Sequence, residues 1–426
     1  MKRFSATSAQ GAVLLAATLS TGLFNYLFNM GMGRLLGPTD YSVISSLFSF
    51  FLIISITIGT VQTVVAKYVA DFIATGQSIW LHRLLSGSLK RMVIISAAIL
   101  LILFSASPFL SRYLQIPSVI PVILVSLILV PSIVLPVTRG ALQGGEKFLE
   151  LGLVGFSEAF LRCVFGFPLV LAGLGVIGGL TGVLAAPVVS LILSIWLLKR
   201  SSIVPAVQDS LADSRDNPVR WGEIYRYACP VLLTLLCFTV LTNSDLIFVK
   251  HFFSSETAGY YSAAEIVGKI ALFIPVGVVP ILMFPKTSAQ HALQKDSTSL
   301  LYKSLLATFI MSGILTVVYF YMDWLIIILL YGQKFLASSH LLGLFGVAMI
   351  FYSMVSVLVY YYLSQRQFGF LYWLAAGAVA QIILIQLFHR TPAQVICVMI
   401  ACGFGLFLAI LLSGVKKHIS AGEIRI

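Results

Sequence analysis

Twelve apolar stretches, most of them about twenty residues long, occupy almost the whole chain. A helix of about twenty residues crosses the roughly 30 Å hydrocarbon core of a bilayer. Because every backbone N–H and C=O must be satisfied inside that core, such stretches predict α-helices. The sequence therefore predicts an all-α polytopic membrane protein with twelve transmembrane helices, over 10–32, 41–70, 90–110, 119–141, 150–173, 176–199, 225–252, 257–285, 301–330, 338–363, 367–388 and 393–415.

Composition and charge support the same class. Of the 426 residues, 59% are hydrophobic and only 10% are charged, against about 25% in ordinary soluble domains. The net charge of +12 comes mainly from Lys and Arg in connections on one side of the predicted spans. Arg139 is counted in these connections, and Lys250 is counted in a connection on the opposite, outer side. The positive-inside rule then places both termini of this multi-pass membrane protein in the cytoplasm. The charge indicates topology and gives no reason to expect a nucleic-acid partner.

The longest polar stretch, 199–226, divides the chain near its middle. We therefore expect an N-terminal six-helix bundle over 1–199, a cytoplasmic linker over 200–224 and a C-terminal six-helix bundle over 225–426. Two bundles in the same orientation form the parallel-repeat plan of many transporters, whose substrate site lies between the lobes. A shorter polar connection, 78–91, carries Trp80 and several leucines at near-helical spacing. It predicts a helix that lies along the lipid headgroups.

Charges inside predicted spans carry functional information, because a charged side chain in the bilayer core is costly. Glu158 and Arg162 share one helix face at i,i+4 spacing, and so do Glu265 and Lys269. Each pair is either a self-neutralising structural bridge or part of a hydrated, partly cationic cavity. In such a cavity, an anionic substrate would replace the carboxylate beside the Arg or Lys.

Other polar residues extend these two candidates. Asp245 follows Thr242, Asn243 and Ser244 in an otherwise apolar stretch, and it is a candidate to hold H⁺ or Na⁺. The alternative is that Asp245 pairs with Lys250 or lies in a wet outer vestibule. Asn25 shares a helix face with Asn29, so it either lines the interface between the lobes or only forms hydrogen bonds between helices.

Prolines and glycines mark places where helices bend or turn. Pro275 and Pro280 lie five residues apart in one span, which makes them the best hinge candidates. The segment 173–178 matches G-x-G-x-x-G, but a dinucleotide site requires a βαβ unit that this chain has no room for. We interpret it as a tight turn, with the pairs Gly175/Gly179 and Gly178/Gly182 allowing close helix packing.

No motif indicates catalysis. The sequence lacks the zinc-protease, P-loop and nucleophile-elbow patterns, and its six His residues show no ligand spacing. We therefore expect no enzyme activity, no metal site and no cofactor. An H⁺ or Na⁺ gradient, or the substrate gradient, would supply any driving force.

Several short segments resemble the polysaccharide and oligosaccharide flippase family. The run Gly33-Arg34-Leu35-Leu36-Gly37-Pro38-Thr39-Asp40-Tyr41 is similar to the family's Arg-x-Leu-Gly-Pro-x-x-Tyr-Gly turn, with Ser42 in place of the last glycine. Further similarities lie in 64–70, 141–148 and 258–264, so the resemblance spans both halves. These motifs are short and mainly structural, and they do not identify a glycan.

The resemblance implies membership of the multidrug/oligosaccharidyl-lipid/polysaccharide (MOP) exporter superfamily, with two six-helix bundles around a cavity that opens alternately to either side. In the flippase branch, a polyprenyl-diphosphate-linked sugar is turned outward. We expect Arg162, Lys269 and Asn25 to contact the substrate. Glu158, Glu265 and Asp245 are candidate counter-charges or coupling sites. These residue roles follow from spacing and position within spans, and no family motif supplies them.

The first hypothesis is therefore a lipid-linked oligosaccharide flippase that acts in polysaccharide assembly at the plasma membrane. Two other functions remain open. One is an ion-coupled multidrug antiporter of the same superfamily, and the other is a non-transporting membrane scaffold for polysaccharide assembly. An antiporter for cationic drugs favours an acidic, aromatic cavity, whereas Arg162 and Lys269 favour an anionic substrate. The expected partners are a lipid-linked glycan, membrane lipids and a polysaccharide polymerase or glycosyltransferases.

Overall fold

The computed structural model describes residues 2–201, 221–277, 279, 287, 298–365 and 367–423. Within these residues the chain is almost entirely helical and contains no strand. Nine of the described helices are long and apolar enough to cross a membrane, by length and composition. The predicted all-α, multi-pass membrane class is confirmed.

Two of these nine spans contain a bend at glycine. The span Ala17–Ser55 is interrupted at Gly37, and Phe148–Arg200 is interrupted at Gly173 and Gly175. If each of these two spans is counted as two helices, the nine spans give eleven helices. The partly described segment that begins at residue 255 gives the twelfth, which is consistent with the twelve predicted helices. The first described elements are α1 (Lys2–Ala74), α2 (Ser78–Tyr113), α3 (Ile120–Gly144), α4 (Phe148–Leu169), η1 (Val170–Leu174) and α5 (Gly175–Arg200). They are followed by α6 (Trp221–Phe252), α7 (Ser255–Gly268), α9 (Thr298–Tyr321), α10 (Asp323–Tyr331), η2 (Gln333–Ser338), α11 (Ser339–Ser364), α12 (Phe370–Leu387) and α13 (Pro392–Glu423).

The chain forms two compact units. The first unit comprises 1–36 and 54–228, and the second comprises 37–53 and 229–426. The middle of α1 therefore belongs to the second unit, and it begins at the backbone bend of Gly37 (φ 75°, ψ 176°). Residues 202–220 of the predicted cytoplasmic linker lie outside the described residues. The boundaries predicted from the chain order stay a prediction.

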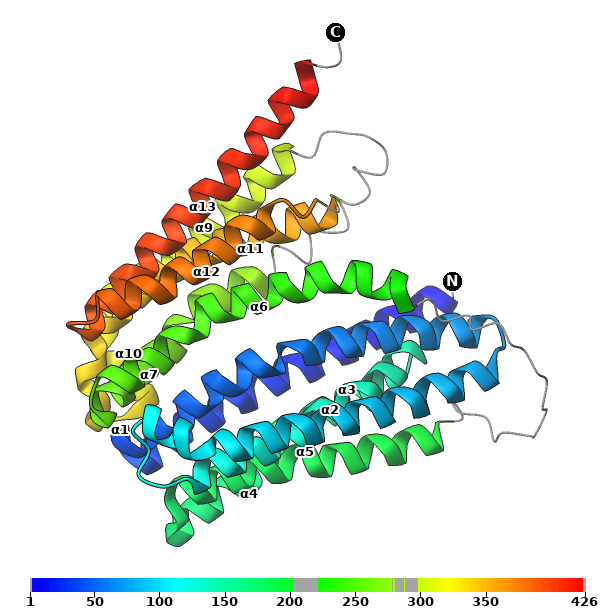
Figure 1. Cartoon of the computed structure of the whole chain (residues 1–426), viewed down its shortest axis with the longest axis horizontal. Helices are drawn as coiled ribbons and strands as arrows, with labels where there is room; N and C mark the ends of the chain where they lie inside the picture. Colours follow the sequence, from blue (N-terminus) through cyan, green and yellow to red (C-terminus); the bar gives the residue numbers. More distant parts are fainter. Residues whose placement is uncertain are drawn as a thin grey trace. The chain divides into compact units, whose positions relative to one another are not determined.

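In the first unit, α3 packs against α2 and α5, and α4 packs along α5 (Figure 1). The contact of α4 with α5 requires glycine, because a Cβ on Gly182 would lie 2.4 Å from the Gly166 Cα. A Cβ on Gly178 would lie 2.8 Å from the backbone of Leu169. The close packing predicted for Gly178 and Gly182 is confirmed. Gly173 and Gly175 both have positive φ, which produces the predicted turn before α5.

The predicted interfacial helix over 78–91 is wrong. These residues form the start of α2, which continues as one helix to Tyr113. Leu81, Leu84 and Leu85 are buried in a core cluster with Val65 and Val69 of α1. The leucine spacing is the same for a face packed on protein and for a face packed on lipid headgroups, so the pattern alone did not distinguish the two.

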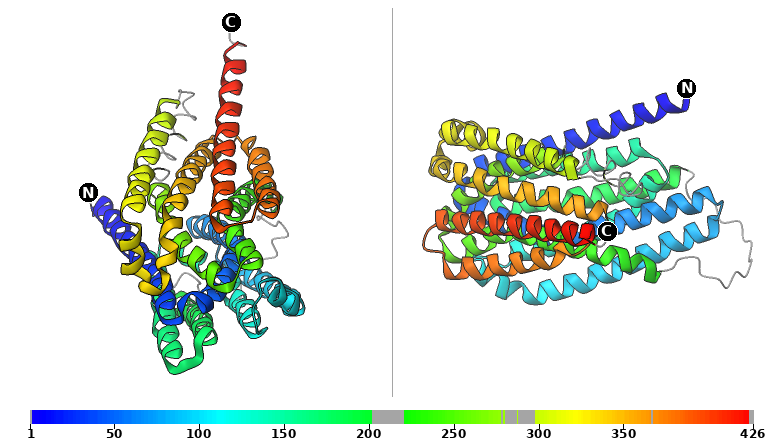
Figure 2. Two further views of the ribbon diagram at one scale, coloured as in Figure 1. Left: turned by 90° about the vertical axis from the view of Figure 1, so that its left-hand side faces the viewer. Right: turned by 90° about the horizontal axis from the view of Figure 1, so that it is seen from above.

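In the second unit, α11 lies at the centre, in contact with α7, α9 and α13 (Figure 2). Glycines allow these contacts, because a Cβ on Gly268 would lie 2.5 Å from the Phe345 side chain, and one on Gly346 would lie 2.8 Å from Thr316. Most of α11 is buried. In contrast, α2 exposes Ile94, Leu101, Ile102 and Phe104, as expected for a lipid-facing helix.

Pro275 lies in a helical stretch, 270–277, and is buried. A proline in a helix frees the carbonyl four residues earlier, here that of Ala271. This carbonyl accepts a hydrogen bond from Ser312 of α9 (2.9 Å). The Ser353 hydroxyl of α11 lies 3.2 Å from it and shares its single hydrogen with the Met349 carbonyl (2.6 Å). The freed carbonyl is therefore held by two neighbouring helices, while a hinge at Pro275 stays a prediction. The second hinge candidate, Pro280, lies outside the described residues.

Candidate functional site

The first unit contains a cluster of opposite charges within its transmembrane helices. The Glu158 carboxylate of α4 contacts Arg162, one turn later on the same helix, at 3.2 Å. Its other oxygen contacts Arg139 of α3 at 2.5 Å. The Asn25 side-chain oxygen of α1 accepts a hydrogen bond from Arg162 Nη1 at 3.1 Å. We call Asn25, Arg139, Glu158 and Arg162 the arginine cluster.

Packing between α1 and α4 holds this cluster in place. The Phe24 ring meets Phe156 and Phe160 edge to face, with centroids 5.5 and 5.4 Å away. The Arg162 guanidinium lies 6.0 Å from the Phe28 ring centroid, within cation–π range. Asn29 donates a hydrogen bond to the Asn25 carbonyl at 2.9 Å. Aromatic contacts and one side-chain amide therefore fix the position of Arg162 relative to α1.

Hydroxyl pairs hold the helices that carry the other two charges. Thr138, next to Arg139, hydrogen-bonds Ser194 of α5 at 2.7 Å. Ser157, next to Glu158, hydrogen-bonds Ser190 of α5 at 3.2 Å. Consecutive residues on a helix point about 100° apart. Thr138 and Ser157 therefore attach α3 and α4 to α5, while the next residues, Arg139 and Glu158, point toward the arginine cluster.

The charge and exposure of the arginine cluster suit an anion. Two guanidinium groups and one carboxylate leave one net positive charge. The side chains of Arg139, Glu158 and Arg162 are 23%, 19% and 21% exposed, so the cluster is not sealed. Both arginine Nε atoms are buried without a hydrogen-bond partner among the described residues. Guanidinium donors in such a setting bind phosphate or carboxylate oxygens well.

The second unit contains a different cluster, which is sealed. Lys269 donates hydrogen bonds to Glu265, one turn earlier, and to the Asn243 side-chain oxygen of α6 at 2.9 Å. Asp245 of α6 accepts a hydrogen bond from the Tyr261 hydroxyl of α7 at 2.8 Å. We call these five residues the acidic cluster. Asp245 and Glu265 are 0% and 1% exposed, so water does not solvate them.

If both carboxylates are ionised, the acidic cluster has one net negative charge, since two carboxylates face one ammonium group. One oxygen of Asp245 and one of Glu265 are buried without a hydrogen-bond partner among the described residues. A buried charge without compensation is costly in a protein interior. A proton or a small monovalent cation would balance it, and the unpartnered oxygens are suitable acceptors or ligands.

The predicted alternative for Asp245 is wrong. Asp245 is fully buried, so it does not lie in a wet vestibule. Lys250 donates instead to Ser42 of α1 at 2.9 Å and to Ser255 of α7 at 2.5 Å. Lys250 itself was expected in an outer connection. It lies in the last turn of α6 and is 0% exposed.

The structure groups the predicted site residues into two sets. Asn25, Glu158 and Arg162 lie in the arginine cluster, whereas Asp245, Glu265 and Lys269 lie in the acidic cluster. Both i,i+4 pairs form the ion contacts that their spacing predicts. Sequence reasoning missed Arg139, which was counted in a connection although it lies inside the predicted span 119–141. It also missed Tyr261, the hydrogen-bond donor to Asp245.

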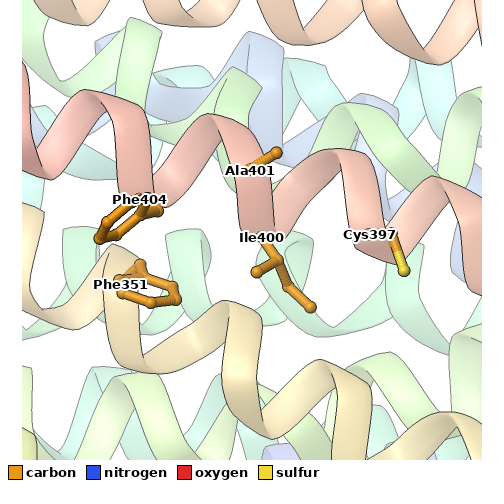
Figure 3. A pocket seen from close by; sticks show the side chains of 5 residues that line it. All are labelled: Phe351, Cys397, Ile400, Ala401 and Phe404. Carbon is orange, nitrogen blue, oxygen red and sulfur yellow. The ribbon is translucent and has the colours of Figure 1, made fainter.

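A shallow cavity of about 340 Å³ lies in the second unit, and it is unrelated to either cluster. Figure 3 shows its five lining side chains on α11 and α13, with Phe351 facing Phe404 across it. The two rings lie 5.3 Å apart. The lining is apolar and contains Phe351, Cys397, Ile400, Ala401 and Phe404. It offers no group for binding a phosphate or a sugar hydroxyl.

Comparison with known families identifies the chain's relatives. The model of the family described as "Polysaccharide biosynthesis protein" matches residues 89–340, more than half of the chain. The chain belongs to this family. The match includes α3, α4, α6 and α7, which carry most of both clusters, and it confirms the membership that the sequence motifs predicted. Among the curated proteins, none matches the chain.

Solved structures show the fold of this polysaccharide biosynthesis protein. It is similar to an inward-facing multidrug resistance MATE family transporter of the MOP superfamily, with a TM-score of 0.74, 15% identity, and coverage of 95% of this chain and 99% of that one. It is also similar to the lipid II flippase MurJ in an inward closed conformation (TM-score 0.71, 15% identity, 94% and 87% covered). A MOP superfamily transporter from Pyrococcus furiosus gives a TM-score of 0.61 at 15% identity, with 98% and 95% covered. The fold is therefore that of the MOP superfamily.

Proposed function

We propose that this protein is a flippase, which moves a polyprenyl-diphosphate-linked oligosaccharide or a related polysaccharide precursor across the cytoplasmic membrane by alternating access. Its family supports a role in polysaccharide assembly, and its fold supports transport. The arginine cluster is the observation that carries the proposal. It offers net positive charge, partly exposed, from helices long enough to span the membrane.

The chemistry of the substrate explains why such a cluster is needed. A diphosphate and a hydroxyl-rich glycan lose their water if they enter hydrocarbon, at a large cost in free energy. Guanidinium groups replace that water with charge-assisted hydrogen bonds to phosphate oxygens. Arg162 and Asn25 would contact the headgroup, while the prenyl tail stays in the lipid. Lys269 is held by Glu265 and Asn243 in a sealed cluster, which supports a role as counter-charge more than as a substrate contact.

We further propose that the acidic cluster couples transport to an ion, with H⁺ or Na⁺ held at Asp245 and Glu265. Its net negative charge and its unpartnered carboxylate oxygens support this role. The measurement that tests it is the dependence of transport on each ion gradient.

We also propose that both termini lie in the cytoplasm, and that the exported precursor passes to a polymerase or glycosyltransferases. A reporter fused to either end would test the orientation.

A gene deletion with complementation tests the flippase proposal. The deletion strain should accumulate a lipid-linked glycan on the inner leaflet, and the wild-type gene should clear it. Arg162→Ala should clear it at least about tenfold more slowly, and Arg162→Lys should retain part of the activity because Lys keeps the charge without the planar fork. Arg200→Ala is the matched control, since Arg200 ends α5 and stacks on an exposed Trp196.

Other outcomes would support the two rival functions. If no lipid-linked glycan accumulates and the deletion strain becomes drug-sensitive, the chain is an ion-coupled multidrug antiporter. If Arg162→Ala at normal expression leaves export unchanged, while the deletion abolishes polysaccharide assembly, the chain acts as a non-transporting scaffold.

A further inference from the structure

Glu158 joins two arginines that come from different helices. One of its oxygens contacts Arg139 of α3, and the other contacts Arg162 of α4. A single carboxylate therefore occupies the place between two guanidinium groups. An i,i+4 pair alone would not need Arg139, so the three-residue arrangement goes beyond a simple helix bridge.

The two guanidinium groups have unused capacity. Each has five N–H donors in a fixed plane. Among the described residues, Arg139 donates one hydrogen bond, to Glu158, and Arg162 donates two, to Glu158 and Asn25. The Nε atoms of both lack partners among the described residues. An anion with several oxygens could therefore accept more hydrogen bonds from this pair than the two oxygens of Glu158 do.

Charge also favours replacement of Glu158. The carboxylate neutralises one of the two guanidinium charges and leaves the other uncompensated. A diphosphate ester carries at least two negative charges, enough to neutralise both. Because water is largely excluded around side chains that are about four-fifths buried, each uncompensated charge has a stronger effect there than in solution.

We propose that Glu158 is a resident counter-ion that a diphosphate displaces, and that Arg139 is the second guanidinium contact for that diphosphate. This inference rests on the proposed function and deepens it, because it assigns selectivity for a diphosphate over a monophosphate. When the diphosphate leaves, Glu158 closes again on both arginines. The carboxylate thus keeps the empty site from remaining doubly positive.

A purely structural bridge predicts different behaviour. If Glu158 only holds α3 to α4, its removal leaves two buried cations unpaired and lowers stability, with no gain in anion binding. If Glu158 competes with the substrate, its removal eliminates the competitor and strengthens anion binding. The two readings differ in the sign of one measured quantity, the anion affinity.

Binding of inorganic pyrophosphate and orthophosphate to the purified full-length protein tests the proposal. The wild type should bind pyrophosphate more tightly than orthophosphate. Glu158→Gln keeps the side-chain size and should bind pyrophosphate about tenfold more tightly. Arg139→Gln should lose most of the preference for pyrophosphate over orthophosphate. Glu150→Gln, in the first turn of α4, is the matched control for the acid, and Arg200→Gln is the control for the arginine.

Glu158→Asp keeps the charge with a shorter side chain. It replaces Glu158→Gln in the pyrophosphate-binding test if the Gln variant does not fold. A shorter carboxylate reaches the two arginines less well, so we expect a smaller gain in pyrophosphate affinity. Unchanged or weaker pyrophosphate binding in a folded Glu158 variant overturns the proposal. So does an unchanged selectivity in Arg139→Gln.

The binding result separates this inference from the proposed function. If wild-type protein moves no lipid-linked diphosphate but Glu158→Gln still gains pyrophosphate affinity, the flippase proposal fails and the displaceable counter-ion stands. If the lipid is moved and no Glu158 variant gains affinity, the counter-ion inference alone fails.

Discussion

An ionised Asp245 would place a charge in the interior of the second unit that its neighbours do not fully balance. It is completely buried, one of its oxygens accepts from Tyr261, and the other has no partner among the described residues. Glu265, in the same cluster, already uses Lys269. A resident proton or monovalent cation at Asp245 is therefore the simplest way to reach neutrality.

Asp245→Asn tests that role, because Asn keeps an acceptor for Tyr261 and removes the charge. We expect transport driven by an H⁺ or Na⁺ gradient to fall at least about tenfold, while pyrophosphate binding at the arginine cluster stays the same. The measurement is substrate movement in vesicles with each gradient imposed separately. Asp323→Asn, in the first turn of α10, is the control. Gradient-driven transport that survives in Asp245→Asn contradicts the coupling proposal.

Arg139 and Lys250 show the limit of sequence reasoning for single residues. Both were counted among charges in connections, yet Arg139 lies inside α3 and Lys250 in the last turn of α6. Both lie near the ends of the predicted spans 119–141 and 225–252, and helix ends are uncertain by several residues in sequence analysis. Charges so close to a span end were assigned to the connections, although the structure places both residues within helices. Pairs on a single helix, such as Glu158 and Arg162, do not have this problem.

Among the elements, the helix that contains Pro275 shows how a freed carbonyl is satisfied. The carbonyl of Ala271 cannot receive its helical N–H. Ser312 donates to it instead, and the Ser353 hydroxyl, shared with the Met349 carbonyl, lies within reach. These serines come from α9 and α11, so the contacts of this carbonyl depend on tertiary packing. Proline marked this position in the sequence as a hinge candidate, which stays a prediction, but no local pattern identified the two serines.

Replacing both serines by Ala should destabilise the packing around the Ala271 carbonyl. Each single variant leaves one donor on the Ala271 carbonyl, so we expect only a small effect. The double variant leaves the buried carbonyl unsatisfied and should cost about 1–3 kcal/mol, more than the sum of the singles. Thermal unfolding of the purified protein measures it, with Ser201→Ala, at the end of α5, as the control. A double variant as stable as the wild type shows that the serines do not stabilise this carbonyl.

Helices were predicted correctly where the length of an apolar stretch defines them. The prediction failed where the surroundings of a helix, protein or lipid headgroups, had to be inferred. The long apolar stretches fixed the helices, and Gly173 to Gly175 marked a turn that the structure contains. The stretch 78–91 was misassigned because a protein core and a lipid headgroup layer select the same leucine spacing. The middle of α1, 37–53, belongs to the second unit, and such an exchange leaves no local pattern in the sequence.

For the whole molecule, the membrane class and family followed from the sequence with little need for geometry. Hydrophobic length and low charge exclude a soluble fold, and short motifs in both halves indicated the family that residues 89–340 match. The MOP fold is retained at 15% identity to solved structures, because helix packing tolerates changes that keep size and polarity. The division of charges into a positive and a negative cluster required the structure, since the arginine cluster joins α1 to α3 and α4, and the acidic cluster joins α6 to α7.

Lipid translocation by the purified protein tests the central claim most directly. The full-length chain is reconstituted in liposomes with a fluorescent polyprenyl-diphosphate sugar, and a membrane-impermeant quencher measures how fast the sugar changes leaflet. We predict that the wild type moves this lipid and that Arg162→Ala slows it at least about tenfold. The corresponding monophosphate lipid should move more slowly than the diphosphate. A wild-type rate equal to that of protein-free liposomes, or an Arg162→Ala rate equal to the wild type, would contradict a flippase that uses the arginine cluster.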